Sequence, residues 1–182
     1  MSVIERIAAF QPDMAAWRHH IHAHPETAFQ ELQTADFVAE RLASFGIQVQ
    51  RGLARTGVVG TLKAGTGNRA IGLRADMDAL DLQELNEFDY RSQHPGKMHA
   101  CGHDGHTTML LGAARYLAET RQFDGTVHFI FQPAEENEAG GRVMIQDGLF
   151  ERFPVEAVFG LHNMPGIEVG KIGVRVGPMM AS

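Results

Sequence analysis

The chain has 182 residues, 44% of them hydrophobic, which suffices for one core of ordinary domain size. Its formal net charge of -6, with no basic stripe to offset it, argues against a nucleic-acid partner. No apolar run approaches the length of a membrane span, and Glu5 and Arg6 interrupt the stretch that would have to serve as an export signal. A single cysteine precludes an internal disulfide, so we expect a cytoplasmic protein without membrane partners.

Amphipathic helices alternate with short apolar strands along the chain. The spacing of apolar residues predicts helices over residues 3–24 (with a possible break at Pro12), 34–45, 107–119 and 141–147. Strands are predicted over residues 47–50, 58–63, 70–74, 127–131, 157–161 and 171–176. The strands at 127–131 and 157–161 are almost wholly apolar, as expected where both faces of a sheet are covered. The alternation indicates an α/β fold, a three-layer sandwich around a mixed, largely parallel sheet.

The segment from His99 to His106 is the most informative part of the chain. It holds three histidines, the only cysteine and an aspartate, with glycines between them. Each of these side chains can bind a divalent metal or orient a group that does. Because a helix would scatter residues two apart onto different faces, we expect Cys101 and His103 to converge from a glycine-punctuated loop. A lone buried cysteine beside surface histidines is the simpler alternative, and the clustering argues against it.

Further polar residues directly follow three predicted strands: Asp76 and Asp78, then Glu135 and Glu136, then His162. Ligands of open α/β sheets bind beyond the carboxyl ends of strands, so these side chains can meet in one crevice. Adjacent carboxylates in extended chain point apart, which lets one bind metal while the other faces water. Three simpler alternatives remain open: the two aspartates form a turn, the two glutamates lie in a solvated acidic loop, and His162 is a core histidine.

A second group of histidines lies between His19 and His24. On a helix only His20 and His24 share a face, and no glutamate completes an HExxH arrangement. We interpret this group as mainly structural or on the substrate side.

Five segments of the chain resemble, in order, the amidohydrolases of the M20 peptidase group. The resemblance is to the branch of hippurate hydrolases, N-acyl-amino-acid amidohydrolases and auxin-conjugate hydrolases. The matching segments are residues 17–26, 72–80, 99–106, 132–136 and 160–163. Asp81 stands where this group usually has proline, which concerns a turn more than the chemistry.

The resemblance implies a zinc-exopeptidase-like fold and hydrolysis of the amide bond of small N-acyl amino acids such as hippurate. A water bound at the metal would be the nucleophile, and two divalent ions (Zn, Mn, Co or Ni) would occupy a complete site. The resemblance implies the metal ligands Cys101, His103, Glu136 and His162, the general base Glu135, and Asp76 and Asp104 as orienting residues.

Members of this group are longer, and continue into a lid domain and a return segment that supplies a further histidine ligand. Residues 1–182 are therefore expected to form the N-terminal part of the catalytic domain, without the lid/dimerisation domain and the return segment. We expect weak metal binding, little activity and exposed apolar surface that favours a homo-oligomer. The alternatives are a non-catalytic metal-binding or interaction module, and a hydrolase that uses Cys101 as nucleophile with His103.

Overall fold

The computed structural model describes residues 2–178, which form six helices and five strands. The helices are α1 (Val3–Ala8), α2 (Gln11–Ala23), α3 (Leu32–Ser44), α4 (His103–Thr120), α5 (Gly140–Gln146) and α6 (Leu149–Arg152). The strands are β1 (Gln48–Leu53), β2 (Gly57–Ala64), β3 (Ala70–Asp76), β4 (Gly125–Gln132) and β5 (Ala157–Gly160). None of the described helices is both long and apolar enough to cross a bilayer.

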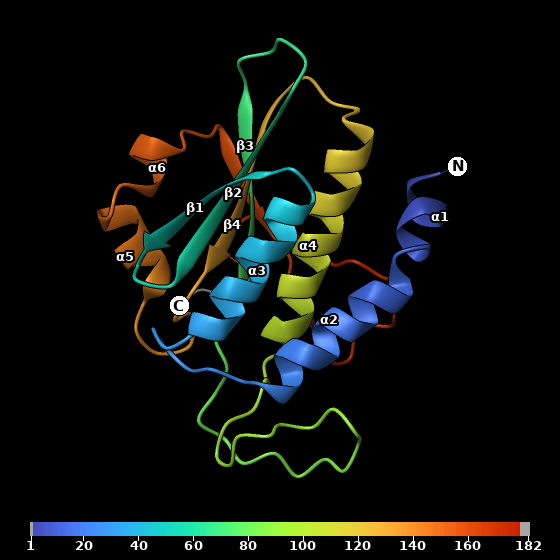
Figure 1. Ribbon diagram of the computed structural model, residues 1–182, viewed down its shortest axis with the longest axis vertical. Helices are drawn as coiled ribbons and strands as arrows, with labels where there is room; N and C mark the ends of the chain where they lie inside the picture. The colour runs from blue at the N-terminus through green and yellow to red at the C-terminus, as the bar shows by residue number, and fades with distance from the viewer. Residues whose placement is uncertain (1, 179–182) are drawn as a thin grey trace.

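The sheet lies between two layers of helices, with α2, α3 and α4 on one side and α5 and α6 on the other (Figure 1). Its strand order is β1-β2-β4-β3-β5. The pairs β1–β2 and β2–β4 are antiparallel, whereas β3 runs parallel to both β4 and β5. The expected α/β sandwich around a mixed sheet is confirmed. Because β3, β4 and β5 run in one direction, their carboxyl ends meet at one edge of the sheet.

Strand β4 carries the core of both layers. Val127, Phe129 and Phe131 belong to the larger apolar cluster under α2, α3 and α4, whereas Ile130 belongs to the cluster under α5 and α6. Successive side chains of a strand point to opposite faces, so a strand covered on both sides must be apolar throughout. The almost wholly apolar run in the sequence, interrupted only by His128, therefore reflects the central position of β4.

The N-terminal helical region is divided in two, at the break that Pro12 allows. Helix α1 ends at Ala8, and α2 begins at Gln11 with Pro12 in its first turn. Proline is well tolerated there because the first backbone N–H groups of a helix have no intrahelical partner.

Helix α4 begins earlier than predicted, which corrects the expectation that Cys101 and His103 both lie in a loop. His103 is the first residue of α4, and Cys101 lies in the loop before it. Gly102 between them has a φ of 90°, and a Cβ there would lie 2.5 Å from the side-chain oxygen of Asn163. Only glycine fits this left-handed turn without strain. The sharp turn sets Cys101 and His103 side by side.

Two predictions for the C-terminal strands are wrong. Residues 171–176 form no strand, and Ile172, Val174 and Val176 are exposed. Strand β5 forms, but it is exposed along its length rather than buried. A strand needs a neighbour for its backbone hydrogen bonds, and within residues 2–178 β5 is the outermost strand of the sheet. The apolar pattern is present here and β5 pairs with β3, but the described residues leave its side chains largely uncovered.

The exposed apolar side chains of β5 predict self-association. Phe159 is 57% exposed and Leu161, just beyond the strand, 52%. Apolar patches of this kind favour contact between copies. We expect sedimentation velocity to show oligomers that increase with protein concentration, and Phe159→Gln to raise the concentration required. Leu85→Gln is the matched control, because Leu85 is 89% exposed but lies in the loop between β3 and α4, away from β5 in the sequence. A Phe159→Gln chain that associates as strongly as the wild type would contradict this prediction.

Candidate metal centre

The side chains that follow the strands meet at the carboxyl edge of the sheet, beside the start of α4. One nitrogen or sulfur atom each of Cys101, His103 and His162 lies within 4.8 Å of the others. The same limit holds for ligand atoms of His103, Glu135 and Glu136. His103 belongs to both groups, so the structure brings together the four predicted metal ligands and the predicted base.

Two unpartnered acceptor atoms face each other at the centre of this cluster. Nε2 of His103 lies 3.6 Å from Oε1 of Glu136, and both atoms are buried without a hydrogen-bond partner. Nδ1 of His103 donates to the carbonyl oxygen of Asp78 at 2.8 Å, which leaves a lone pair on Nε2 in the neutral ring. A buried lone pair facing a carboxylate is unfavourable unless a proton or a cation lies between them. The pair therefore fits a divalent cation, with Sγ of Cys101 and Nε2 of His162, 3.4 Å apart, as further donors.

Asp78 links two of the predicted ligands. Besides its carbonyl oxygen, its Oδ1 lies 3.3 Å from Nδ1 of His103. Its Oδ2 accepts a hydrogen bond of 2.9 Å from the backbone N–H of Glu136. Burial alone would raise the pKa of Asp78, but the bonds from His103 and from the 135–136 backbone outweigh it and lower that pKa. Asp78 is thus an ionised carboxylate that orients both His103 and Glu136.

Asp76 orients a different histidine. Its Oδ1 accepts a hydrogen bond of 2.6 Å from Nδ1 of His106, and its Oδ2 lies 2.7 Å from Nη1 of Arg74. Burial opposes ionisation, but these two partners hold the pKa of Asp76 well below its usual range. Nε2 of His106 in turn lies 2.5 Å from Oδ1 of Asn163. Asp76 therefore acts through His106 on the residue next to His162.

The thiol of Cys101 is protonated at neutral pH in this environment. Burial, followed by the hydrogen bond and charge of Glu136, raises its pKa to about 12. A metal that binds the sulfur as thiolate must therefore displace a proton.

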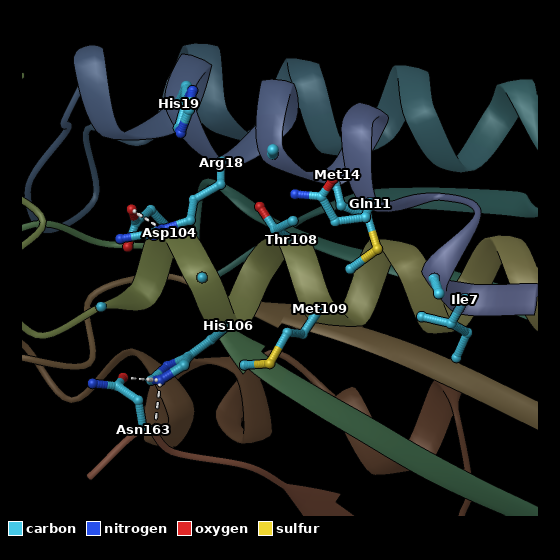
Figure 2. Close-up of a pocket in the computed structure, with 14 residues that line it drawn as sticks. Ile7, Gln11, Met14, Arg18, His19, Asp104, His106, Thr108, Met109 and Asn163 are labelled. Atoms are coloured by element: carbon cyan, nitrogen blue, oxygen red, sulfur yellow. Dashed lines mark hydrogen bonds and ion pairs between the residues drawn. The ribbon is translucent and has the colours of Figure 1, made fainter. Parts of the chain in front are cut away.

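Asp104 ties the start of α4 to α2, and its side-chain partners are not among the predicted metal ligands. Its Oδ2 accepts a hydrogen bond of 3.0 Å from Nε of Arg18 (Figure 2). The same oxygen lies 2.8 Å from Nδ1 of His22. Nε2 of His22 lies 3.0 Å from Oε1 of Glu84 in the loop between β3 and α4. The hydrogen bonds with Asp104 and Glu84 raise the pKa of His22 in spite of its burial. The buried His22 thus joins α2 to α4 and to the loop between β3 and α4.

Glu31 is a residue that the sequence analysis missed. Its side chain is fully buried; Oε1 accepts hydrogen bonds from the backbone N–H groups of Ala134 at 2.9 Å and Phe29 at 3.1 Å. Its Oε2 accepts a hydrogen bond of 2.7 Å from the hydroxyl of Thr56. Ala134 directly precedes Glu135 and has a left-handed φ of 52°. Glu31 thus holds the turn that presents Glu135 and Glu136.

A pocket of about 720 Å³ opens between the helices α1 and α2 and the N-terminal half of α4 (Figure 2). Its wall includes the apolar side chains of Ile7, Met14 and Met109. His106 and Asn163, which are hydrogen-bonded to each other, line its end near the candidate metal centre. The predicted ligands themselves do not line the pocket, so these two residues lie between it and the candidate metal centre.

Comparison with known proteins gives consistent matches. A family model described as peptidase family M20/M25/M40 matches residues 72–178. The hippurate hydrolase of Campylobacter jejuni is 50% identical over 100% of this chain and 47% of its own length. The N-acyl-L-amino acid amidohydrolase of Geobacillus stearothermophilus is 48% identical over 93% of this chain and 46% of its own length. The chain thus spans about half the length of the curated relatives it matches.

A solved structure from the same family also matches the chain. The crystal structure of a dinuclear metal-binding peptidase of the M20 family from Bacillus subtilis matches with a TM-score of 0.89 and 40% identity. The match covers 94% of this chain and 48% of that one.

Loss of the Glu31 carboxylate should destabilise the turn at Ala134. In Glu31→Ala two backbone N–H groups and the Thr56 hydroxyl lose their acceptor, so we expect the free energy of unfolding to fall by about 3 kcal/mol. Metal affinity should fall about tenfold as Glu135 and Glu136 lose their support. Urea denaturation and metal titration check both effects. Glu40→Ala, an exposed change on the same helix, should alter neither.

The His22 bridge should make stability depend on pH. Because its folded-state pKa lies above the ordinary value of 6.5, the folded chain keeps a proton that the unfolded chain loses. This contribution is full below about pH 6.5 and is lost as the pH rises through the folded-state pKa. In His22→Gln we expect a smaller decline of the unfolding free energy between about pH 6 and about pH 8.

A second histidine serves as a control of opposite sign. Burial lowers the pKa of His128, so its contribution to stability is lost as the pH falls. In His128→Gln we therefore expect the free energy of unfolding to decline less than in the wild type as the pH falls, and to be unchanged in its dependence at higher pH. Equal pH profiles for the wild type and His22→Gln would contradict the assigned bridge.

Proposed function

Because the chain belongs to the peptidase family M20/M25/M40, we propose that it forms the metal-binding, N-terminal part of the catalytic domain of an amidohydrolase. The proposed reaction is hydrolysis of the amide bond of N-acyl amino acids. The observation that carries the proposal is the buried pair of Nε2 of His103 and Oε1 of Glu136, which face each other without a partner.

The residues proposed to hold the metal are Cys101, His103, Glu136 and His162. A thiolate, two imidazoles and a carboxylate together favour zinc, manganese, cobalt or nickel over magnesium or calcium. A divalent metal at these donors would polarise the substrate carbonyl and make a bound water more acidic. Two ions for each complete site is the proposed number, because the related B. subtilis protein is a dinuclear metal-binding peptidase.

Glu135 is the proposed general base. Its side chain is exposed, whereas Glu136 beside it is partly buried and turned toward His103. Glu135 can therefore meet a substrate and a water that approach from solvent. It would take a proton from the water as the new C–O bond forms, and return it to the amide nitrogen as the C–N bond breaks. The products are a carboxylic acid and a free amino acid.

The proposed substrate class follows from the relatives. The two relatives described above are named for hippurate and for N-acyl-L-amino acids, and a relative from Arabidopsis thaliana is named for IAA-amino acid conjugates. We extend this class, small N-acyl amino acids, to the present chain. A cytoplasmic location and a homo-oligomer that forms through the exposed surface of β5 are further parts of the proposal.

The cysteine-nucleophile alternative has little support from the site. A nucleophilic cysteine needs a lowered pKa, whereas burial and Glu136 raise the pKa of Cys101 to about 12. Measurements of turnover and metal content distinguish the remaining alternative, a non-catalytic metal-binding module, from an enzyme.

Glu135→Gln should separate hydrolysis from metal binding. Removing a general base costs about 10²- to 10⁴-fold in turnover. We expect hippurate and N-acetyl amino acid hydrolysis to fall by that factor, while elemental analysis shows unchanged metal content. Cys101→Ser should instead lose metal and activity together, because it replaces a predicted ligand.

Glu138→Gln is the matched control, since Glu138 is an exposed carboxylate in the same loop. It should retain both metal and turnover. A wild-type chain that binds metal at this cluster yet hydrolyses none of these substrates would favour the non-catalytic module.

A further inference from the structure

His162 is the one predicted metal ligand that lies on an exposed part of the chain. His103 is fully buried, and Cys101 and Glu136 are half-buried. His162 follows β5, and every described residue from 157 to 178 is exposed. Packing therefore does little to hold its imidazole at the candidate metal centre, and specific contacts have to do so.

The first of these contacts is with the next residue of the chain. Nδ1 of His162 donates a hydrogen bond of 2.7 Å to the carbonyl oxygen of Asn163. This bond leaves Nε2 directed at Sγ of Cys101, 3.4 Å away. A metal-binding imidazole typically donates its other N–H to a carbonyl or carboxylate in this way. The place of Asn163 thus decides where the ring of His162 points.

Asn163 is held in turn by His106, which projects from the first turns of α4 (Figure 2). The ring of His106 is buried, and its Nδ1 donates a hydrogen bond of 2.6 Å to the ionised carboxylate of Asp76. In the neutral ring this leaves a lone pair on Nε2, which accepts a hydrogen bond of 3.1 Å from the backbone N–H of Asn163. Oδ1 of Asn163 lies 2.5 Å from the same nitrogen, and a half-turn of the amide would place the donor Nδ2 there.

Asn163 also lies against the turn that carries the other donors. A Cβ on Gly102, between Cys101 and His103, would lie 2.5 Å from Oδ1 of Asn163. The ring centroids of His106 and His162 are 4.5 Å apart. The segment that supplies Cys101 and His103 therefore also receives the segment that supplies the third donor.

We propose that His106 is a positioning residue, which acts through Asn163 to fix His162 beside Cys101 and His103. The proposal rests on the proposed function, in which His162 is a metal ligand. His106 is not itself a ligand here, because its two nitrogens are engaged by Asp76 and Asn163. The buried ring is the link between a fixed carboxylate at the end of β3 and an exposed donor after β5.

A double-mutant cycle tests the proposal, with Co²⁺ titrated into the 182-residue chain in a calorimeter. His106→Ala should weaken Co²⁺ binding about tenfold. In the His162→Ala chain the same substitution should change the affinity by less than about twofold, because the donor that it positions is already gone. A merely structural role of His106 predicts the same loss in both chains, and equal losses would overturn the proposal.

Thr107→Val is the matched control. Thr107 is the next residue of α4 and is fully buried, and its hydroxyl donates a hydrogen bond of 2.9 Å to the carbonyl oxygen of Asp76, not to Asn163. This variant should lower stability but leave the Co²⁺ affinity within about twofold of the wild type. His106→Gln keeps a polar group near Asn163, so it should lose less affinity than His106→Ala. A loss in Thr107→Val as large as in His106→Ala would contradict the assigned role.

Amide hydrogen exchange without metal separates this proposal from the proposed function. The backbone N–H of Asn163 should exchange about tenfold faster in His106→Ala than in the wild type, because it loses its acceptor. The amides of β4 should keep their rates. Equal exchange of the Asn163 amide in the two chains would overturn the proposal. A wild-type chain that binds no Co²⁺, together with faster exchange in His106→Ala, would contradict the proposed metal centre alone.

Discussion

Two carboxylates at the end of β3 position the rest of the site. The carboxylate of Asp76 binds Nδ1 of His106, and the backbone carbonyl oxygen of Asp78 accepts a hydrogen bond from Nδ1 of His103, so both histidines near the start of α4 are held at the end of the sheet. Such charges are costly to bury, and they are tolerated because each accepts several hydrogen bonds. Removing the Asp76 carboxylate would leave the buried His106 without its partner, and removing that of Asp78 would leave the backbone N–H of Glu136 without its acceptor. The helix, the strand end and the candidate ligands therefore form one connected unit.

The sheet sets the place of this unit. β3 is parallel to both β4 and β5, so the residues that follow these strands emerge together. Glu136 follows β4 and His162 follows β5, and a single helix start adds His103 between them. Three chain segments far apart in sequence thus supply the candidate donors, two of them (Cys101 and His103) from the segment at the start of α4. The hydrogen bonds of Glu31 with Ala134 and of His22 with Asp104 hold these segments in position.

Much of this arrangement follows from patterns within the sequence. The apolar run at β4 and polar residues directly after strands are local signals, and they predicted a central strand and a site at the sheet edge. The histidines and cysteine near residue 101 predicted the donor types. The prediction failed where a tertiary neighbour decides the outcome, as at residues 171–176, whose alternating apolar residues find no partner strand within the described chain.

Other features had no local signal at all. Glu31 is one carboxylate at the start of an amphipathic helix, and only the fold shows that it reaches Ala134, far along the chain. The helical position of His103 depends on the turn at Gly102, and a glycine in the sequence is equally compatible with a longer loop.

The high pKa of the Cys101 thiol has a consequence for metal binding. A metal that bound this sulfur would have to displace its proton, so acidification would weaken any such binding.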